Sequence, residues 1–317
     1  MALDLLHTWG PDNVAQLLVS TLEKRAKKEV ANAIFNAIPT FEYLNSKGRV
    51  MLDGGASIVT PLEIGENTTA KFYDGYDPLD VTAQDNHTAT QYKWKQASVS
   101  VSISGREVAQ NRGESQIMNL LELKQKNAER SLKNVINRKL HGAANTSLET
   151  LSLVTLIDAT STIGEINSTA NTYWQASVTS GGVFASQGVA NWRTLYNTLK
   201  NRGGNPDMII TTQTIHEAYE ATMAPQIRYT SLGVGDTRFR DLEFAGSKVR
   251  FDDQCASGVS YFLDSDALHL YVNEGVNFKY NEFVRPPDQD AKVAQFMVML
   301  ELATSNRRLL GKVTGQS

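Results

Sequence analysis

Residues 91–104 read Gln-Tyr-Lys-Trp-Lys-Gln-Ala-Ser-Val-Ser-Val-Ser-Ile-Ser and give the longest strand signal in the chain. Apolar side chains alternate with polar ones, first on even and then on odd positions: Tyr92, Trp94, Ala97, Val99, Val101 and Ile103. The change of phase near Gln96 indicates a bulge or a change of partner face. At about 3.3 Å per residue this stretch spans roughly 45 Å, longer than most strands in compact domains. We therefore expect residues 52–104 to form an extended β arm with a mobile tip around residues 66–86.

A long amphipathic helix is expected after the arm. Apolar residues keep one helical face from Glu114 to His141, and Gly142 is a suitable terminator. Such a helix is about 40 Å long. Between Ser115 and His141 the basic residues outnumber the acidic Glu122 and Glu129: Lys124, Lys126, Arg130, Lys133, Arg138 and Lys139. The helix is thus a locally basic rod in a protein whose net charge is −3.

The remaining segments have mixed patterns. A helix with a solvated charged face is expected over residues 12–37, and the Ser/Thr-rich stretch 143–193 predicts ordered loops and short strands because it also carries many apolar residues. From Asn191 onward the pattern is α/β. Helices are expected near 192–203 and 214–223, and strands at 208–210, 248–252, 259–263 and 268–273. The turn Asp264–Asp266 should join the last two strands as a hairpin turn, and residues 295–303 and 309–314 should form a closing hairpin.

Composition excludes several classes of protein. The 317 residues suggest about two domains, and 41% hydrophobic with 21% charged residues is typical of a globular chain. The net charge of −3 argues against a strongly basic nucleic-acid clamp. A single cysteine, Cys255, excludes an internal disulfide framework. No apolar run approaches the roughly 20 residues of a membrane span, and no basic segment precedes an apolar one as in a secretory signal.

A search for catalytic motifs finds almost nothing. The pair His216-Glu217 resembles the start of a zinc-protease helix, but Glu220 occupies the position of the second histidine. No nucleophile elbow or phosphate-binding loop occurs. Three aspartates spaced by three, Asp74, Asp77 and Asp80, could hold a hard cation, although a solvated loop tip is the interpretation we favour. The sequence predicts no enzyme, no cofactor and no metal site.

The order of these elements resembles the major capsid protein of tailed bacteriophages, which has the Hong Kong 97-type fold. The segments that carry the resemblance are packing motifs: Val259–Tyr271, Pro287–Lys292, Val293–Thr314 with Ser305-Asn306-Arg307-Arg308 inside it, Tyr173-Trp174, Arg193–Tyr196 and Pro206–Thr212. The resemblance covers nearly the whole chain. It implies an α+β fold in five parts. These are an N-terminal helical arm (1–48), an extended β arm or E-loop (49–110), the spine helix of a peripheral domain (111–142), an α/β axial domain (143–277), and C-terminal strands that complete the peripheral domain (278–317).

The function implied is structural. Copies of the chain would form hexamers and pentamers that tile an icosahedral phage head around double-stranded DNA, a virion shell assembled in the host cytoplasm. The resemblance also implies a portal protein as partner. Because ordered structure is expected from about Asp12, we expect a separate scaffolding protein rather than a cleaved N-terminal one. No membrane partner is implied.

Two groups of residues are candidates for this role. Assembly contacts are expected in the arm and in the loop 224–241: Lys71, Asp74, Asp77, Asp80, Arg228, Arg238 and Asp241. The family places the spine helix towards the interior, where Lys126, Arg130 and Lys133 could face DNA non-specifically. Nothing marks a reactive Lys–Asn pair, so no crosslink through Lys71 is expected.

Other interpretations stay open. An encapsulin-like nanocompartment shell would enclose a cargo enzyme instead of DNA. A hydrolase with an unrecognised site, or a monomeric binding module, would belong to other classes. The sequence gives no triangulation number, host, cement protein or maturation state.

Overall fold

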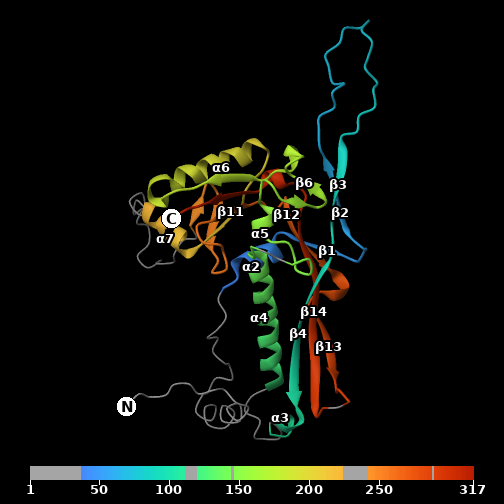
Figure 1. The fold of residues 1–317 in the computed structure, drawn as a ribbon, viewed down its shortest axis with the longest axis vertical. Helices are drawn as coiled ribbons and strands as arrows, with labels where there is room; N and C mark the ends of the chain where they lie inside the picture. The colour runs from blue at the N-terminus through green and yellow to red at the C-terminus, as the bar shows by residue number, and fades with distance from the viewer. Residues whose placement is uncertain (1–36, 111–119, 144–145, 224–241, 288) are drawn as a thin grey trace, which may run out of the picture. The chain divides into compact units, whose positions relative to one another are not determined.

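The computed structural model describes residues 37–110, 120–143, 146–223, 242–287 and 289–317 (Figure 1). The chain divides into two compact units. The described part of the smaller unit comprises residues 97–110, 120–134, 278–287 and 289–298, and that of the larger comprises residues 37–96, 135–143, 146–223, 242–277 and 299–317. The helix expected at 12–37 lies outside the described residues.

The smaller unit is built on paired strands. Most of β4 (Lys95–Ser104) and the first part of β14 (Ala291–Thr304) lie side by side, and β13 (Lys279–Val284) is antiparallel to β14. In β4 the side chains alternate as expected, with Val101 and Ile103 buried between exposed serines. The short helix α3 (Gly105–Gln110) begins with a reciprocal cap, because Ser104 Oγ accepts from the Glu107 amide while Glu107 accepts from the Ser104 amide.

The helix α4 (Leu120–Leu140) belongs to the smaller unit up to Asn134 and then to the larger one. Its buried residues Ala128, Leu132, Ile136 and Leu140 recur every four residues, as the amphipathic pattern predicts. The expected start at Glu114 lies outside the described residues.

In the larger unit, the second half of β14 pairs with further strands of the same sheet. The strand β12 (Leu268–Asn273) is antiparallel to β14, with Leu268 opposite Thr304 and Val272 opposite Leu300. On the other side of β12, β1 (Arg49–Leu52) runs parallel to it. Residues 49–52 are therefore part of this sheet rather than of a projecting arm.

A second sheet of six strands has the order β7-β15-β11-β8-β10-β9. The strands span Ser177–Ser180, Gly311–Thr314, Ser260–Leu263, Met208–Thr211, Ser247–Phe251 and Glu243–Phe244. Every residue of β8 is buried, as its continuous apolar run predicts. The helices α6 (Val189–Asn201) and α7 (Gln213–Met223), with the π-helical turn η2 (Phe184–Gly188), pack on this sheet (Figure 1). Trp192 lies at the centre of their aromatic core, edge-on to Phe184, Phe244 and Phe262.

Three strand connections differ from expectation. The strand signal at 91–104 is two strands, because β3 (His87–Tyr92) ends before Lys93 and β4 begins at Lys95, so the change of phase is a change of partner. The turn at Asp264–Asp266 does not make a hairpin, since β11 and β12 belong to different sheets. The expected closing hairpin is also wrong: β14 ends in one sheet, and after η5 (Arg307–Leu309) β15 pairs with β11 and β7. Alternation identifies strands but not their partners.

The stretch 143–193 is ordered, as predicted. It contains α5 (Leu153–Leu156), β5 (Thr162–Ile163), β6 (Ile166–Asn167), η1 (Thr172–Trp174) and β7. Leu153, Leu156, Ile163 and Trp174 are buried.

A buried polar cluster fixes the helix α2 (Pro39–Ser46). The Asp252 carboxylate accepts from Thr40 Oγ1 at 2.7 Å and from Asn137 Nδ2 at 3.1 Å. His141 Nε2 lies 3.5 Å from Asp252 Oδ2. Burial alone would raise the pKa of Asp252, but the hydrogen bond and charge of His141, together with Thr40, lower it to about 2. The cluster joins α2, the C-terminal end of α4 and the residue after β10.

Glu301 is a second buried acid, on β14. Its Oε1 accepts from the Leu151 amide at 2.8 Å and from Thr150 Oγ1 at 3.1 Å, while its buried Oε2 has no partner among the described residues. Burial raises its pKa to about 7, although these hydrogen bonds and the charge of Lys95 oppose the rise. Glu301 thereby ties the loop after α4 to the sheet in its protonated form.

Glu301→Gln should flatten the dependence of stability on pH. The folded protein holds the Glu301 proton up to about pH 7, whereas the unfolded chain releases it near pH 4.5. The free energy of unfolding should therefore fall as pH rises through this window, by about 3 kcal/mol in all, and this fall should be absent in the variant. Urea unfolding at several pH values between 4.5 and 8 measures it. The exposed Glu282→Gln on β13 is the control, and an unchanged slope in Glu301→Gln would contradict the assignment.

Candidate assembly arm and the charged face of α4

The arm consists of a two-stranded hairpin and the loop beyond it. The strand β2 (Ile58–Glu63) is antiparallel to β3, in register from Ile58 opposite Tyr92 to Glu63 opposite His87. These two strands form a sheet of their own. Residues 64–86 leave the hairpin as a long loop (Figure 1). The arm is therefore shorter than the predicted 49–110, because β1 and β4 belong to another sheet.

Hydrogen bonds across the loop give it a defined shape. The Ile64 amide donates to Asn86 O at 2.9 Å, and Thr68 Oγ1 donates to Gln84 Oε1 at 3.0 Å. Nearer the tip, Lys71 Nζ donates to Pro78 O at 2.8 Å. The last turn closes where the Asp77 amide donates to Asp74 O at 2.8 Å. The predicted contact residue Lys71 is thus part of the loop's own framework.

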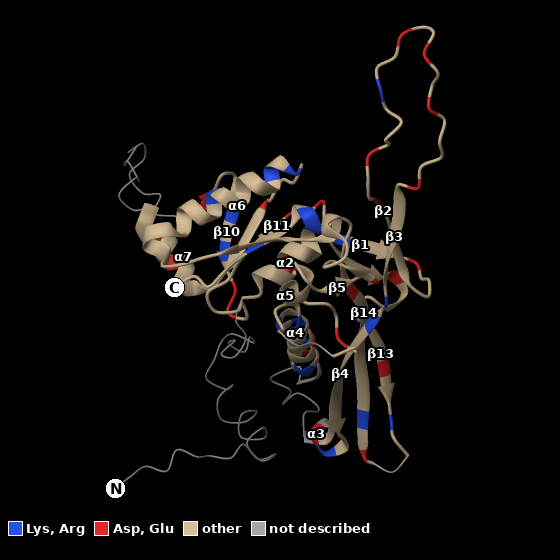
Figure 2. Ribbon diagram, turned by 45° about the horizontal axis from the view of Figure 1, so that its top comes forward, with Lys and Arg blue, Asp and Glu red and all other residues tan. Residues whose placement is uncertain are grey.

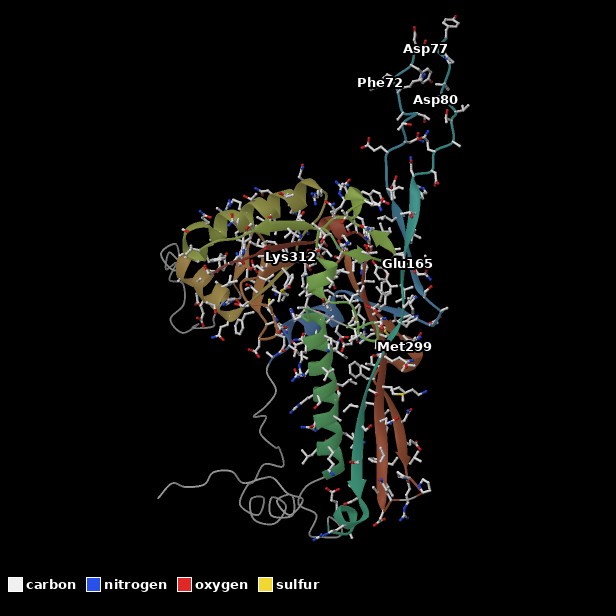
Figure 3. The ribbon with its side chains drawn as sticks, in the orientation of Figure 1. Phe72, Asp77, Asp80, Glu165, Met299 and Lys312 are labelled. Atoms are coloured by element: carbon white, nitrogen blue, oxygen red, sulfur yellow. The ribbon has the colours of Figure 1, made fainter. Side chains whose placement is uncertain are left out.

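The loop exposes large apolar side chains to solvent. Phe72 and Tyr76 have exposed fractions of 107% and 103%, the values of side chains that touch almost nothing (Figure 3). Other exposed apolar residues of this loop are Tyr73, Leu79 and Val81. Aromatic residues supply much of the binding energy at protein interfaces, and an exposed group of them marks an interaction surface. Within its own unit the loop buries none of these side chains.

The three predicted aspartates serve local turns. Asp80 Oδ1 accepts from the Thr82 hydroxyl at 2.6 Å and from its amide at 3.0 Å, and these bonds lower the pKa of Asp80. Asp77 Oδ2 accepts from the Asp74 amide at 3.1 Å, and Asp74 Oδ1 accepts from the Gly75 amide. Among the described residues no group of acids, histidines and cysteines could hold a metal ion. The carboxylates make the loop strongly acidic, as Figure 2 shows.

The predicted DNA-facing residues on α4 differ from one another in environment. Lys126 pairs with Glu122 at 2.7 Å, and Lys133 pairs with Glu129 at 2.6 Å while lying 5.8 Å from the Phe278 ring centre. Both pairs have glutamate four residues before lysine, the favourable order on a helix. Arg130 is exposed, and the described residues give it no hydrogen bond or ion pair. The uncompensated charge of this segment is therefore concentrated on Arg130.

The remaining candidate residues either lie outside the described part of the chain or have surroundings that do not favour catalysis. Arg228, Arg238 and Asp241 lie outside the described residues. Cys255 is buried and donates to Val259 O, and burial raises the pKa of its thiol to about 12, which makes it a poor nucleophile. The His216 ring packs edge-on to Phe251 with centroids 5.2 Å apart. No helix in the described part of the chain has the length and apolar character needed to cross a bilayer.

The chain resembles several solved structures despite low sequence identity. The capsid asymmetric unit of cyanophage A-1(L) matches with 13% identity and a TM-score of 0.69, over 91% of this chain and 95% of that chain. The capsid of a native GTA particle matches with 8% identity and a TM-score of 0.64, over 94% and 97%. The SrpI encapsulin of Synechococcus elongatus PCC 7942 matches with 7% identity and a TM-score of 0.60, over 97% and 95%. No family model and no curated protein matches the sequence.

The chain has the capsid fold of tailed phages. The α+β fold of the Hong Kong 97 type expected from the sequence is thereby confirmed. The matches cover more than nine-tenths of both chains, so the likeness extends over most of the chain.

Removing the exposed aromatic groups should leave stability unchanged. In the double variant Phe72→Ser/Tyr76→Ser the free energy of unfolding should stay within about 0.5 kcal/mol of wild type, because neither side chain is buried in the single chain. Phe262→Ala, at a fully buried position in the aromatic core, should cost about 3–5 kcal/mol under the same conditions. Urea unfolding of the unassembled chain compares them. A large loss in the double variant would show that the loop packs on its own chain.

Proposed function

We propose that this chain is a major capsid protein that assembles into the hexamers and pentamers of an icosahedral phage head around double-stranded DNA. The observation that carries the proposal is a capsid fold over most of the chain together with an arm whose aromatic residues are not buried in their own unit. A shell protein needs such a surface, since each copy must bury part of itself on its neighbours. In this proposal the protein resides in the virion and has no catalytic role.

The arm is the principal contact in this proposal. Phe72 and Tyr76 are buried on a neighbouring copy, and Asp74, Asp77 and Asp80 face basic groups there. Lys71 holds the two sides of the loop together through Pro78. Arg228, Arg238 and Asp241 remain proposed contacts around the capsomer axis, in the part assigned to the axial domain (143–277).

A separate scaffolding protein and a portal protein complete the proposed set of partners. The match to the SrpI encapsulin supports a second candidate, a nanocompartment shell. The contents of the shell distinguish the two, because a phage head holds DNA and a nanocompartment holds a cargo protein. Gene neighbours give an independent indication: portal, terminase and scaffold genes against a single cargo enzyme.

Electron microscopy of the purified chain, with sedimentation of the same sample, is the first test of assembly. We expect closed shells, tubes or capsomer rings, formed either by the chain alone or with its co-expressed scaffold. A chain that stays monomeric with the scaffold present would contradict the proposal. Nuclease treatment and protein analysis of any shells then identify the contents.

Deleting Glu66–Asn86 should leave a folded monomer that builds no stable shells. The loop contributes no core residue, so the loss should appear in particle yield rather than in the melting temperature. Phe72→Ser/Tyr76→Ser should lower the yield in the same direction, and Val59→Ser, at an exposed apolar position on β2 outside the loop, is the matched control. Normal shells from the deletion would remove the arm from the proposed mechanism.

Reversing charge on α4 should reduce genome packaging without preventing shell formation. The triple variant Lys126→Glu/Arg130→Glu/Lys133→Glu should package less DNA, because like charges repel the phosphates. Arg130→Glu alone should give part of this effect, because each of the three reversals replaces a positive charge on α4 by a negative one, including those at the paired Lys126 and Lys133. Arg130→Lys keeps the charge and serves as control. Wild-type DNA content in the triple variant would exclude α4 as a DNA contact.

A further inference from the structure

Arg307 lies in η5 of the larger unit and is fully buried. Within the described residues no carboxylate lies within ion-pair distance of its guanidinium. Instead, Nε donates to Leu156 O at 2.8 Å, one terminal nitrogen donates to Ser161 O at 3.1 Å and to Ser168 Oγ, and the other donates to Asp158 O at 2.7 Å. Desolvation lowers its pKa to about 10, so it stays charged at neutral pH.

A buried charge with these partners constrains their backbone. Each N–H of a planar guanidinium points in a fixed direction, so carbonyl groups that accept from it must converge on one plane. The carbonyls belong to Leu156, Asp158 and Ser161, and Trp174 covers the guanidinium with its ring centre 5.9 Å away. Trp174 Nε1 in turn donates to Ile163 O at 3.0 Å. The segment 155–168 is therefore shaped around Arg307.

This segment presents a tight turn. The strands β5 and β6 pair Ile163 with Ile166, which leaves Gly164 and Glu165 as a two-residue connection. Both have positive φ, 61° and 69°, as a type I′ turn requires. Glu165 is labelled in Figure 3, where the turn lies beside the β2–β3 hairpin.

The turn contacts the base of the arm. Gly164 O accepts from the Gln91 amide of β3 at 3.2 Å. A side chain at position 164 would place its Cβ 2.7 Å from Thr90 Cβ and 3.3 Å from the Tyr92 ring, so the turn lies directly against β3. Tyr92 Oη also donates to Thr304 O at 3.0 Å, three residues before Arg307. The buried Thr90 and Tyr92 are thus held between the turn and the end of β14.

We propose that Arg307 is the positioning residue of the arm: by shaping segment 155–168 it sets the Gly164 turn that holds β3 in place. A two-stranded hairpin is only marginally stable alone, and β2–β3 has no third strand. The direction in which the β2–β3 hairpin points therefore depends on β3, the strand that the Gly164 turn contacts. The relevance to assembly rests on the proposed function, but the brace itself is a property of the single chain.

Hydrogen exchange of the unassembled full-length chain tests the brace. Arg307→Lys keeps the charge but loses the planar set of donors, and amides of β3 should exchange about tenfold faster while those of β8 stay protected. Arg308→Lys, the same change at the exposed neighbouring position, should leave both unchanged. Faster exchange at β3 alone supports the proposal; unchanged exchange at β3 in folded Arg307→Lys overturns it.

A double-variant cycle separates positioning from general support. Gly164→Ala disrupts the turn directly, because its Cβ meets Thr90. If Arg307 acts through this turn, the combined variant should lose no more β3 protection than the more affected single variant. If the increases in β3 exchange rate caused by the two single variants multiply in the combined variant, Arg307 acts independently of the Gly164 turn, and the proposal is overturned.

Should Arg307→Lys fail to fold, Ser168→Ala removes a single acceptor of the guanidinium and takes its place in both measurements, with the same two outcomes. Because these experiments need no shell, a chain that fails to assemble but shows the predicted exchange would contradict the proposed function alone.

Discussion

The larger unit depends on one constraint: a charge removed from water must be fully hydrogen-bonded. Asp252, Glu301 and Arg307 are each almost completely buried, and each gathers donors or acceptors from segments distant in sequence. Asp252 holds α2, Glu301 holds the loop after α4, and Arg307 holds the segment that braces the arm. Loss of any of the three leaves buried groups without partners, which costs more than an exposed ion pair contributes. These three buried residues thus hold a helix, a loop and a turn-forming segment in place against the sheets.

Periodicity predicted the elements well where one face is buried. The apolar run at Met208–Thr211 and the helical spacing in α4 and α6 reappear in the structure as buried faces. The pairing of the strands was harder to predict than the strands themselves, because the residue pattern in β11, β12, β14 and β15 is compatible with more than one partner. The wrong closing hairpin shows this: residues 305–310 look like a turn, yet they carry the chain from one sheet into another.

The site was predictable in outline only. The long strand signal at 91–104 indicated an arm with its tip near 66–86, but the sequence argument did not single out the aromatic residues Phe72 and Tyr76 that the structure leaves exposed there. Arg307, by contrast, had no sequence signal beyond its place in the segment Ser305-Asn306-Arg307-Arg308, because its acceptors are largely backbone carbonyls that no residue type reveals. The charge count on α4 already included Glu122 and Glu129, but it could not show that these two acids pair with Lys126 and Lys133 and leave Arg130 without a partner among the described residues.

The cross-loop hydrogen bonds of the arm have a consequence for association. A segment that acquires its shape only on binding must lose its conformational entropy at that moment, which weakens the contact for a given buried area. The ties at Asn86, Gln84 and Pro78 restrict residues 64–86 beforehand. In the proposed assembly, more of the energy of burying Phe72 and Tyr76 is then available to hold copies together, so a lower protein concentration suffices to start a growing lattice.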